Sequence, residues 1–277
     1  MKADLHMHST WSDGLCTMRE LVDKAHLQGI DIIAITDHDV VGDIDDAIRY
    51  AQARGITVLP GIELSTLEQN KSVHLLGYFT DQSYHSAELK AYFIDIKTKR
   101  ERRAKTIIEN LKHFNDIHIT YERVLAHARG IIARPHIAKA IHESYPVYDH
   151  DYIFDHFIGD HCDAYVPSVE LPVEEGIALL RRNHCVVILA HPTLLKPHIK
   201  DYVLSLDYDG IEARYIRNLP GEEAFFVEWA RQRDLFITAG SDFHGIQGDT
   251  KHGDIGDVVL DGLDLDRFLA RLKKTTS

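Results

Sequence analysis

The feature that most constrains the fold is a pattern that occurs five times along the chain. In each instance a short apolar segment is followed at once by histidine, aspartate or glutamate. The segments are DLHMH (4–8), IIAITDHD (32–39), VLPGIEL (58–64), VVILAHP (186–192) and LFITAGSDFH (235–244). Apolar runs of this length are typical of buried strands, and parallel α/β folds collect functional groups at the carboxyl ends of their strands. The pattern therefore predicts a single cluster of polar side chains at one edge of a sheet.

The segments between these strands are typical of amphipathic helices. Residues 17–29 have helical spacing, with Thr17 and Glu20 in a capping-box pattern and Gly29 as a stop signal. Residues 45–55 repeat this arrangement, and residues 72–79 (SVHLLGYF) indicate a further strand. Apolar strands that alternate with such helices predict a parallel, buried sheet.

The alternation is interrupted in the middle of the chain. A long helical pattern starts at about Tyr84, and shorter helical segments follow it with few strand signals. We therefore expect an all-helical insertion in an α/β domain. The expected division is 1–83 for the first part of the α/β domain, 84–163 for the insertion and 164–277 for the second part.

Composition limits the classes of partner. The formal net charge of -12 argues against an electrostatic grip on duplex nucleic acid and against binding to an anionic membrane. Three widely spaced cysteines without a CxxC motif support neither a disulfide framework nor a zinc knuckle. With no signal-peptide pattern and no apolar run near 18 residues, we expect a cytoplasmic protein. The sequence leaves the oligomeric state undetermined.

The residue types at the strand ends are those that bind metals. His6 and His8 are two positions apart, so on a strand that ends near His8 their side chains would point to the same side. Imidazole and carboxylate groups together suit first-row transition metals. Two surface histidines near a terminus are the alternative for this pair alone, but five strand ends of the same kind favour a metal site.

In order along the chain, DLHMHSTWSDG, TDHD, PGIE, AHP and GSDFHG resemble the PHP (polymerase and histidinol phosphatase) family of metal-dependent phosphoesterases. The insertion, with ARPHIAKAI and the AYVP that follows it, resembles the branch of 3′,5′-nucleotide bisphosphate phosphatases and 5′→3′ exoribonucleases. This resemblance implies a distorted (β/α)7 barrel that binds two or three divalent metal ions. Mn²⁺ is the first expectation, and Zn²⁺ and Fe²⁺ suit the same ligands.

The resemblance also implies the ligands of each metal. They are His6, His8, Glu63 and Asp242 for the first metal, Glu63 again with His74 and His191 for the second, and Asp13, His38 and His244 for the third. It places Asp242, His191 and Glu63 in the catalytic centre. Asp37 and Asp39 are interpreted as residues that orient ligands or form a turn, and His26 and His252 are expected to have no special role.

A metal cluster of this kind favours hydrolysis of phosphate esters by a hydroxide generated at the metals. Arg134 and His136 stand at a predicted helix start, which is a natural anion site, so we expect both to contact substrate phosphate. Arg100 and Arg103 share a helix face and are expected to line the same cleft. A salt-bridged arginine, a packed histidine and a solvated helix face are the structural alternatives for these residues.

The expected reaction is removal of the 3′-phosphate from nucleoside 3′,5′-bisphosphates, with one phosphate at the metals and the other held by Arg134. Trimming of short 5′-phosphorylated RNA is compatible with the same resemblance, so the expected partner is a nucleotide or a short oligonucleotide. A histidinol-phosphate or other small phosphomonoester phosphatase and a polymerase-associated editing nuclease are alternatives. A non-catalytic metal-binding or regulatory module is an alternative of another class, but it would lack ligands that this sequence contains.

Overall fold

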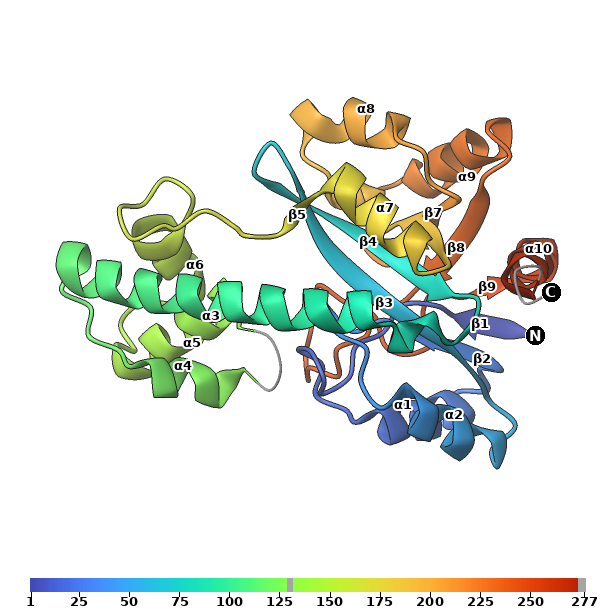
Figure 1. Cartoon of the computed structure of the whole chain (residues 1–277), viewed down its shortest axis with the longest axis horizontal. Helices are drawn as coiled ribbons and strands as arrows, with labels where there is room; N and C mark the ends of the chain where they lie inside the picture. Colours follow the sequence, from blue (N-terminus) through green and yellow to red (C-terminus); the bar gives the residue numbers. More distant parts are fainter. Residues whose placement is uncertain (129–131, 274–277) are drawn as a thin grey trace. The chain divides into compact units, whose positions relative to one another are not determined.

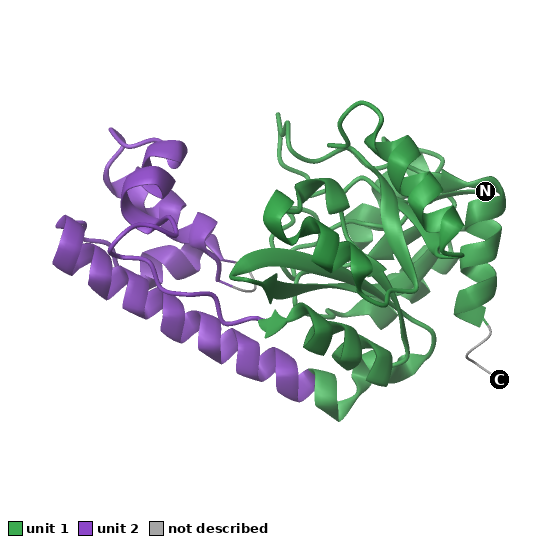
Figure 2. Cartoon of the chain, turned by 90° about the horizontal axis from the view of Figure 1, so that it is seen from above, with its two compact units in different colours: residues 1–89, 171–277 green, residues 90–170 purple. Residues whose placement is uncertain are grey.

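The computed structural model describes residues 1–128 and 132–273 (Figure 1). The chain divides into two compact units: residues 1–89 with 171–277 form unit 1, and residues 90–170 form unit 2 (Figure 2). Both boundaries lie a few residues later than the expected 84 and 163. The long helix α3 (Ala87–Asn115) begins in unit 1 and continues into unit 2, and Glu170 forms an ion pair with Arg100 inside unit 2.

Unit 1 contains the sheet and the helices that cover it. Its strands are β1 (Lys2–Asp4), β2 (Ile32–Ile35), β3 (Thr57–Glu68), β4 (Lys71–Phe79), β5 (Leu171–Pro172), β6 (Cys185–Leu189), β7 (Gly210–Tyr215), β8 (Phe236–Gly240) and β9 (Leu260–Asp261). Its helical segments are α1 (Met18–Leu27), α2 (Ile44–Gln52), η1 (Gln82–His85), the start of α3, α7 (Val173–Arg182), η3 (Pro192–Leu194), α8 (Pro197–Ser205), α9 (Glu222–Gln232) and α10 (Gly262–Lys273).

The sheet forms a distorted barrel. Its strand order is β8-β7-β6-β4-β3-β2-β1-β9, and β5 pairs with β3 outside this path. The chain beyond β1 closes the ring by pairing with β8 and with the chain that follows β8, through hydrogen bonds from Leu5 N–H to Ala239 O (3.1 Å) and from His8 N–H to Phe243 O (2.9 Å). The structure thus confirms the expected distorted α/β barrel with a helical insertion.

Two strands run against their neighbours, which corrects the expectation of a wholly parallel sheet. The edge strand β9 is antiparallel to β1. β4 is antiparallel to both of its neighbours, β3 and β6. Gln69 and Asn70 join β3 to β4 with φ angles of 47° and 61°, which is the conformation of a two-residue hairpin turn. Because β4 is reversed, its first residues lie at the end of the barrel where the parallel strands finish.

Helix α1 of unit 1 begins and ends as its sequence predicts. Thr17 and Glu20 form the expected capping box at the start of α1, and Gly29 follows the helix with a φ of 67°. Helix α1 buries Leu21, Val22 and Ala25 and packs beside α2 (Figure 1). These two helices cover the β1–β2 side of the sheet and leave the loops at the strand ends free to carry polar groups.

Unit 2 is built of helices and loops in its described residues. They are α3, α4 (Tyr121–His127), α5 (Arg134–Ser144), α6 (His150–Ile153) and the π-helical turn η2 (Phe154–Ile158). Its core is a separate apolar cluster that includes Ile107, Leu111, Val124, Ile137 and Ile153. None of the helices in the described ranges of either unit is long and apolar enough to cross a membrane.

A core residue of α10 provides a test of this architecture. Phe268 is fully buried, and its ring lies 5.1 Å from the ring of Tyr78 on β4. We expect Phe268→Ala to lower the free energy of unfolding by about 3–5 kcal/mol because it leaves a cavity in the barrel core. Leu263→Ala on the same helix is the matched control, since Leu263 is 81% exposed and its removal should change stability by no more than about 0.5 kcal/mol. Equal effects in chemical denaturation would contradict the packing described for α10.

Candidate metal centre

The structure brings all nine candidate ligands together at one end of the barrel of unit 1. They come from the chain after β1, β2, β6 and β8, from β3, and from the start of the reversed strand β4. His6 and His8 lie beyond the end of β1 rather than within it, in the extended segment that closes the barrel, yet both side chains are fully buried. Gly240 permits this closure, because a Cβ at that position would lie 2.3 Å from the His6 Cβ.

Glu63 is the centre of the cluster. Its Oε1 lies 2.8 Å from His74 Nδ1 and 2.9 Å from His191 Nε2. Its other oxygen, Oε2, lies 3.2 Å from His6 Nε2 and 3.1 Å from His8 Nε2. One buried carboxylate is therefore placed to be shared between two metal positions.

The first group adds Asp242 to His6, His8 and Glu63. Asp242 Oδ1 lies 3.4 Å from His6 Nε2 and 3.1 Å from His8 Nε2. All four residues are buried, and their ligand atoms lie within 4.8 Å of one another. This group matches the set that the sequence predicts for the first metal.

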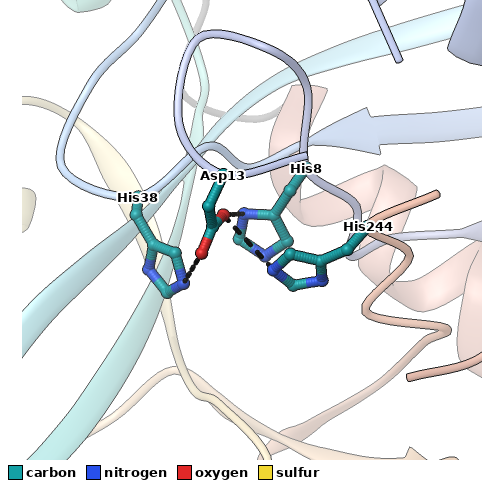
Figure 3. Close-up of side chains that lie close together, drawn as sticks. All are labelled: His8, Asp13, His38 and His244. Atoms are coloured by element: carbon teal, nitrogen blue, oxygen red, sulfur yellow. Dashed lines mark ion pairs between the residues drawn. The ribbon is translucent and has the colours of Figure 1, made fainter. Parts of the chain in front are cut away.

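The residues predicted for the third metal, with His8 beside them, surround Asp13 and are called the third group (Figure 3). Asp13 Oδ1 lies 3.3 Å from His244 Nε2 and 3.7 Å from His8 Nδ1, and Asp13 Oδ2 lies 3.9 Å from His38 Nε2. The ring of His8 stacks on both histidines, with centroids 4.2 Å from His244 and 4.5 Å from His38. His8 thus presents one ring nitrogen to the first group and the other to the third.

The geometry and chemistry of these groups fit divalent metal ions. Among the described residues, His6 Nε2, His8 Nε2, His38 Nδ1 and Glu63 Oε2 are buried and lack a hydrogen bond of good geometry, although they point at one another. Ligand atoms about 2.0–2.1 Å from one ion lie about 2.8–3.4 Å apart, which is the range of the closest contacts in the first group. Buried atoms with neither water nor a hydrogen-bond partner are costly, and an ion between them removes that cost.

The charges of the cluster are also compatible with bound divalent cations. Burial would raise the pKa of Glu63, but the imidazoles of His38, His6 and His74 outweigh burial and hold that pKa well below its ordinary value. Conversely, burial would lower the pKa of His8, but Asp242 and Glu63 raise it to about 10. The carboxylates are therefore ionised beside charged imidazoles, and bound cations would displace the imidazole protons and supply the positive charge in their place.

Backbone conformation aims several of these side chains. His191 and Asp242 have φ angles of 25° and 55°, which non-glycine residues rarely adopt. Each strained residue has its N–H satisfied: Asp242 N–H donates to His6 O at 2.9 Å, and His191 N–H donates to a carboxylate oxygen of Glu212 at 2.8 Å. Strain of this kind is found at functional sites, where the surrounding structure holds it in place.

Sequence reasoning missed Glu212 and Tyr215, which β7 presents to the cluster. The register between β7 and β8 shifts between Glu212 and Arg214, so Ala213 is the extra residue of a β-bulge. Residues three apart on a regular strand point to opposite faces, but this bulge allows both Glu212 and Tyr215 to be buried. The segment YDGIEA was a visible signal for Glu212, since it has the same strand-then-acid form as the five recognised segments.

These two residues hold three candidate ligands. Glu212 Oε1 lies 3.0 Å from His6 Nδ1, while Glu212 Oε2 accepts the His191 N–H. The Tyr215 hydroxyl donates to Asp242 Oδ2 at 2.9 Å. Partners of this kind set the orientation of a ligand and the nitrogen that a histidine offers to the metal.

His252 also has a place at the site, so the expectation that it has no special role is corrected. Its ring stacks on His244 with centroids 4.1 Å apart, and its Nε2 lies 3.8 Å from Asp242 Oδ2. Its Nδ1 lies 2.6 Å from Asp249 Oδ2, which fixes the ring. The short, irregular segment between His244 and His252 gave no periodic signal from which this approach could be predicted.

The residues that flank His38 orient the loops, as interpreted from the sequence. Asp37 accepts hydrogen bonds from Ser9 N–H at 2.7 Å and from the Ser12 hydroxyl at 2.6 Å. Asp39 accepts from Ser65 N–H at 2.8 Å and has a φ of 51°. Both side chains are buried and tie neighbouring strand ends together.

The four predicted substrate contacts lie in unit 2, each with protein partners. Arg134 Nη1 lies 2.8 Å from Asp160 Oδ1, and the His136 ring accepts the Ala133 N–H at the start of α5. In addition, Arg100 pairs with Glu170 at 2.9 Å, and Arg103 Nε donates to the backbone carbonyls of residues 166 and 167. A structural role would use the same contacts, so substrate binding by these residues stays a prediction.

Removal of Glu212 tests whether β7 holds the metal ligands. We expect Glu212→Ala to lower affinity for divalent metal by about 10–100-fold, because His6 and the His191 backbone lose their shared partner. The measurement is metal content by atomic emission after dialysis against graded chelator. Glu212→Gln, which keeps the shape, should give a smaller loss, and Glu223→Ala on the surface of α9 is the control. Equal metal content in a folded Glu212→Ala protein would contradict this role.

Comparison with known proteins agrees with the motifs and the barrel. The PHP domain model matches residues 4–152. A 5′-3′ exoribonuclease of Haemophilus influenzae is 28% identical over 88% of this chain and 90% of its own, and a 3′,5′-nucleoside bisphosphate phosphatase of Chromobacterium violaceum is 27% identical over 87% and 86%. A solved structure from Bifidobacterium adolescentis, assigned as a metal-dependent phosphoesterase, aligns with a TM-score of 0.81 at 30% identity and covers 97% of this chain and 96% of that one. The chain therefore belongs to the PHP-domain family of phosphoesterases.

Proposed function

We propose that this phosphoesterase removes the 3′-phosphate from nucleoside 3′,5′-bisphosphates. The observation that carries the proposal is the cluster around Glu63, in which one buried carboxylate contacts five imidazoles and joins adjacent groups of candidate ligands. The bisphosphate phosphatase relative supports the choice of substrate, because it matches over most of both chains. A non-catalytic module is disfavoured, since every ligand position that the motifs predict is filled.

We propose Mn²⁺ as the native metal, with Zn²⁺ and Fe²⁺ as alternatives, at two or three positions. Histidine nitrogen mixed with carboxylate oxygen suits all three ions, and the absence of cysteine from the cluster disfavours a softer metal. When bound, such ions lower the pKa of coordinated water and offset the charge of a phosphate during in-line attack.

The side chains of the cluster have defined protonation states, which set what each can do in the reaction. Glu63 and Asp242 are ionised, since nearby histidines hold the pKa of each below its ordinary value despite burial. Burial and Asp242 raise the pKa of Tyr215, so its hydroxyl remains a donor that fixes Asp242. We propose that Asp242 Oδ1 and His191 lie beside the reacting water and phosphate, and that Glu63 sets the spacing between the metals.

A second candidate function is 5′→3′ trimming of short 5′-phosphorylated RNA. The exoribonuclease relative favours it, since the match covers 90% of that protein. Both reactions break a phosphate ester beside a ribose, so the metal groups serve either one. The length of nucleic acid that the protein accepts distinguishes the phosphatase from the exoribonuclease. Turnover of histidinol phosphate tests the remaining alternative, a phosphatase for other small phosphomonoesters.

The first test is phosphate release with added Mn²⁺. We expect turnover of adenosine 3′,5′-bisphosphate to exceed turnover of histidinol phosphate and of a short 5′-phosphorylated RNA, and to stop on chelation. Asp242→Asn should lower kcat/KM at least about 100-fold, because the first metal position loses an anionic ligand. Turnover of histidinol phosphate alone would overturn the proposed substrate, and predominant release of mononucleotides from RNA would favour the second candidate.

A second test concerns Arg134, which we propose binds the phosphate that is not cleaved. Adenosine 3′-monophosphate lacks that phosphate, so it serves as the reference substrate. We expect Arg134→Ala to reduce the preference for the bisphosphate over adenosine 3′-monophosphate by about 10–100-fold, which is the loss of one charged hydrogen bond. Arg123→Ala on the surface of α4 is the control. An unchanged preference would leave Arg134 with only its structural pairing to Asp160.

A further inference from the structure

Several exposed apolar side chains lie in segments that follow the strands of unit 1, on the side of the strands that carries the candidate ligands. Among its described residues, the large apolar side chains that remain exposed include six in loops after β1, β6, β7 and β8, at the end that carries the candidate ligands. They are Trp11, Leu15, Leu194, Ile216, Leu219 and Ile246. Exposed apolar surface at the end of a fold where polar groups converge is typical of a ligand-binding site.

Trp11 is the aromatic member of this set, and it lies within the loop that carries two candidate ligands. His8 precedes it by three positions and Asp13 follows it by two, so the Cα atoms of Trp11 and Asp13 are at most about 7 Å apart. The loop is held by its own hydrogen bonds: Trp11 N–H donates to the Ser9 hydroxyl at 3.1 Å, and Gly14 N–H donates to Ser9 O at 3.0 Å. The backbone of Trp11 is therefore fixed relative to the metal groups.

The indole packs against a glycine and is only partly covered. It lies against Gly42 in the loop after β2, where a Cβ would be 2.4 Å from Trp11 Cγ and 2.6 Å from Nε1. Glycine at position 42 is therefore required by the close approach of the ring. Even so, Trp11 remains 47% exposed. An aromatic ring that is supported by a contact and partly exposed is suited to stacking, because a tryptophan side chain has only two torsions to order.

We infer that Trp11 stacks on the nucleobase of the substrate whose phosphate lies at the metal groups. This inference rests on the proposed function and specifies how that site selects a base. Every nucleobase has a π-face, so stacking on tryptophan binds bases with little sequence preference. It also suits an acidic chain, because stacking with a neutral base needs no positive charge on the protein.

Fluorescence tests the inference directly, because the chain has only two tryptophans, Trp11 and Trp229. Trp229 lies on α9 beside Arg233, so Trp229→Phe leaves Trp11 as the sole tryptophan. We expect adenosine 5′-monophosphate to quench this fluorescence in the Mn²⁺-loaded protein, and ribose 5-phosphate to have little effect. Equal responses to the two ligands, or no response to either, would overturn the inference.

Kinetics provide a second test that does not depend on fluorescence. We expect Trp11→Leu, which keeps apolar area but loses the π-face, to reduce the preference for adenosine 3′,5′-bisphosphate over base-free ribose 3,5-bisphosphate by about 5–150-fold. Trp11→Phe should retain part of the preference, and Leu263→Ala on α10 is the control. A loss that is equal for both substrates would show that Trp11 only supports the loop from His8 to Asp13.

The two tests separate failure of the inference from failure of the proposed function. If the wild-type protein hydrolyses the bisphosphate but adenosine 5′-monophosphate fails to quench Trp11, the substrate assignment stands and the stacking role is wrong. If the nucleotide quenches Trp11 but the bisphosphate is not hydrolysed, base stacking stands and the proposed reaction is wrong.

Discussion

The burial of the Glu63 carboxylate is the interaction on which the rest of the site depends. A charge removed from water needs close partners, and here five imidazoles from separate parts of unit 1 provide them. Those imidazoles come from the chain after β1, β2 and β6 and from β4, so the ends of several strands must converge for the carboxylate to be tolerated. The barrel therefore brings these residues together, and divalent cations at the same atoms would make their burial favourable.

Two departures from a regular α/β barrel make this convergence possible. The hairpin at Gln69 and Asn70 reverses β4, so His74 reaches Glu63 from near the start of a strand rather than from its end. The bulge at Ala213 lets β7 present both Glu212 and Tyr215 to the cluster. Each departure changes which face or end of a strand meets the metal groups, and each adds contacts that a regular strand would not supply.

Much of the site could be predicted from the sequence because its signal is local. An apolar run followed by His, Asp or Glu can be read along the chain, and parallel strands bring such ends together without further information. The direction of β4 could not be read in this way, because Gln-Asn is a weak hairpin signal beside Asn-Gly. Glu212 was accessible to the same rule but was overlooked, whereas Tyr215 and His252 depend on a bulge and on an irregular loop. Their positions follow from tertiary packing, which local patterns do not encode.

The phosphate and the base of the proposed substrate need different surfaces of the protein, because only the phosphate is charged. With a formal net charge of -12, the chain as a whole repels a bisphosphate, so attraction must come from local positive charge. Metal ions can supply that charge at the Glu63 cluster, where the carboxylates are already ionised. A nucleobase carries no charge and needs only apolar surface, which the partly exposed Trp11 would provide under the proposed stacking role. Because Trp11 lies between His8 and Asp13 on one hydrogen-bonded loop, the loop that carries two candidate metal ligands also carries the indole. The proposed recognition of the base would therefore be tied to the geometry of the metal site.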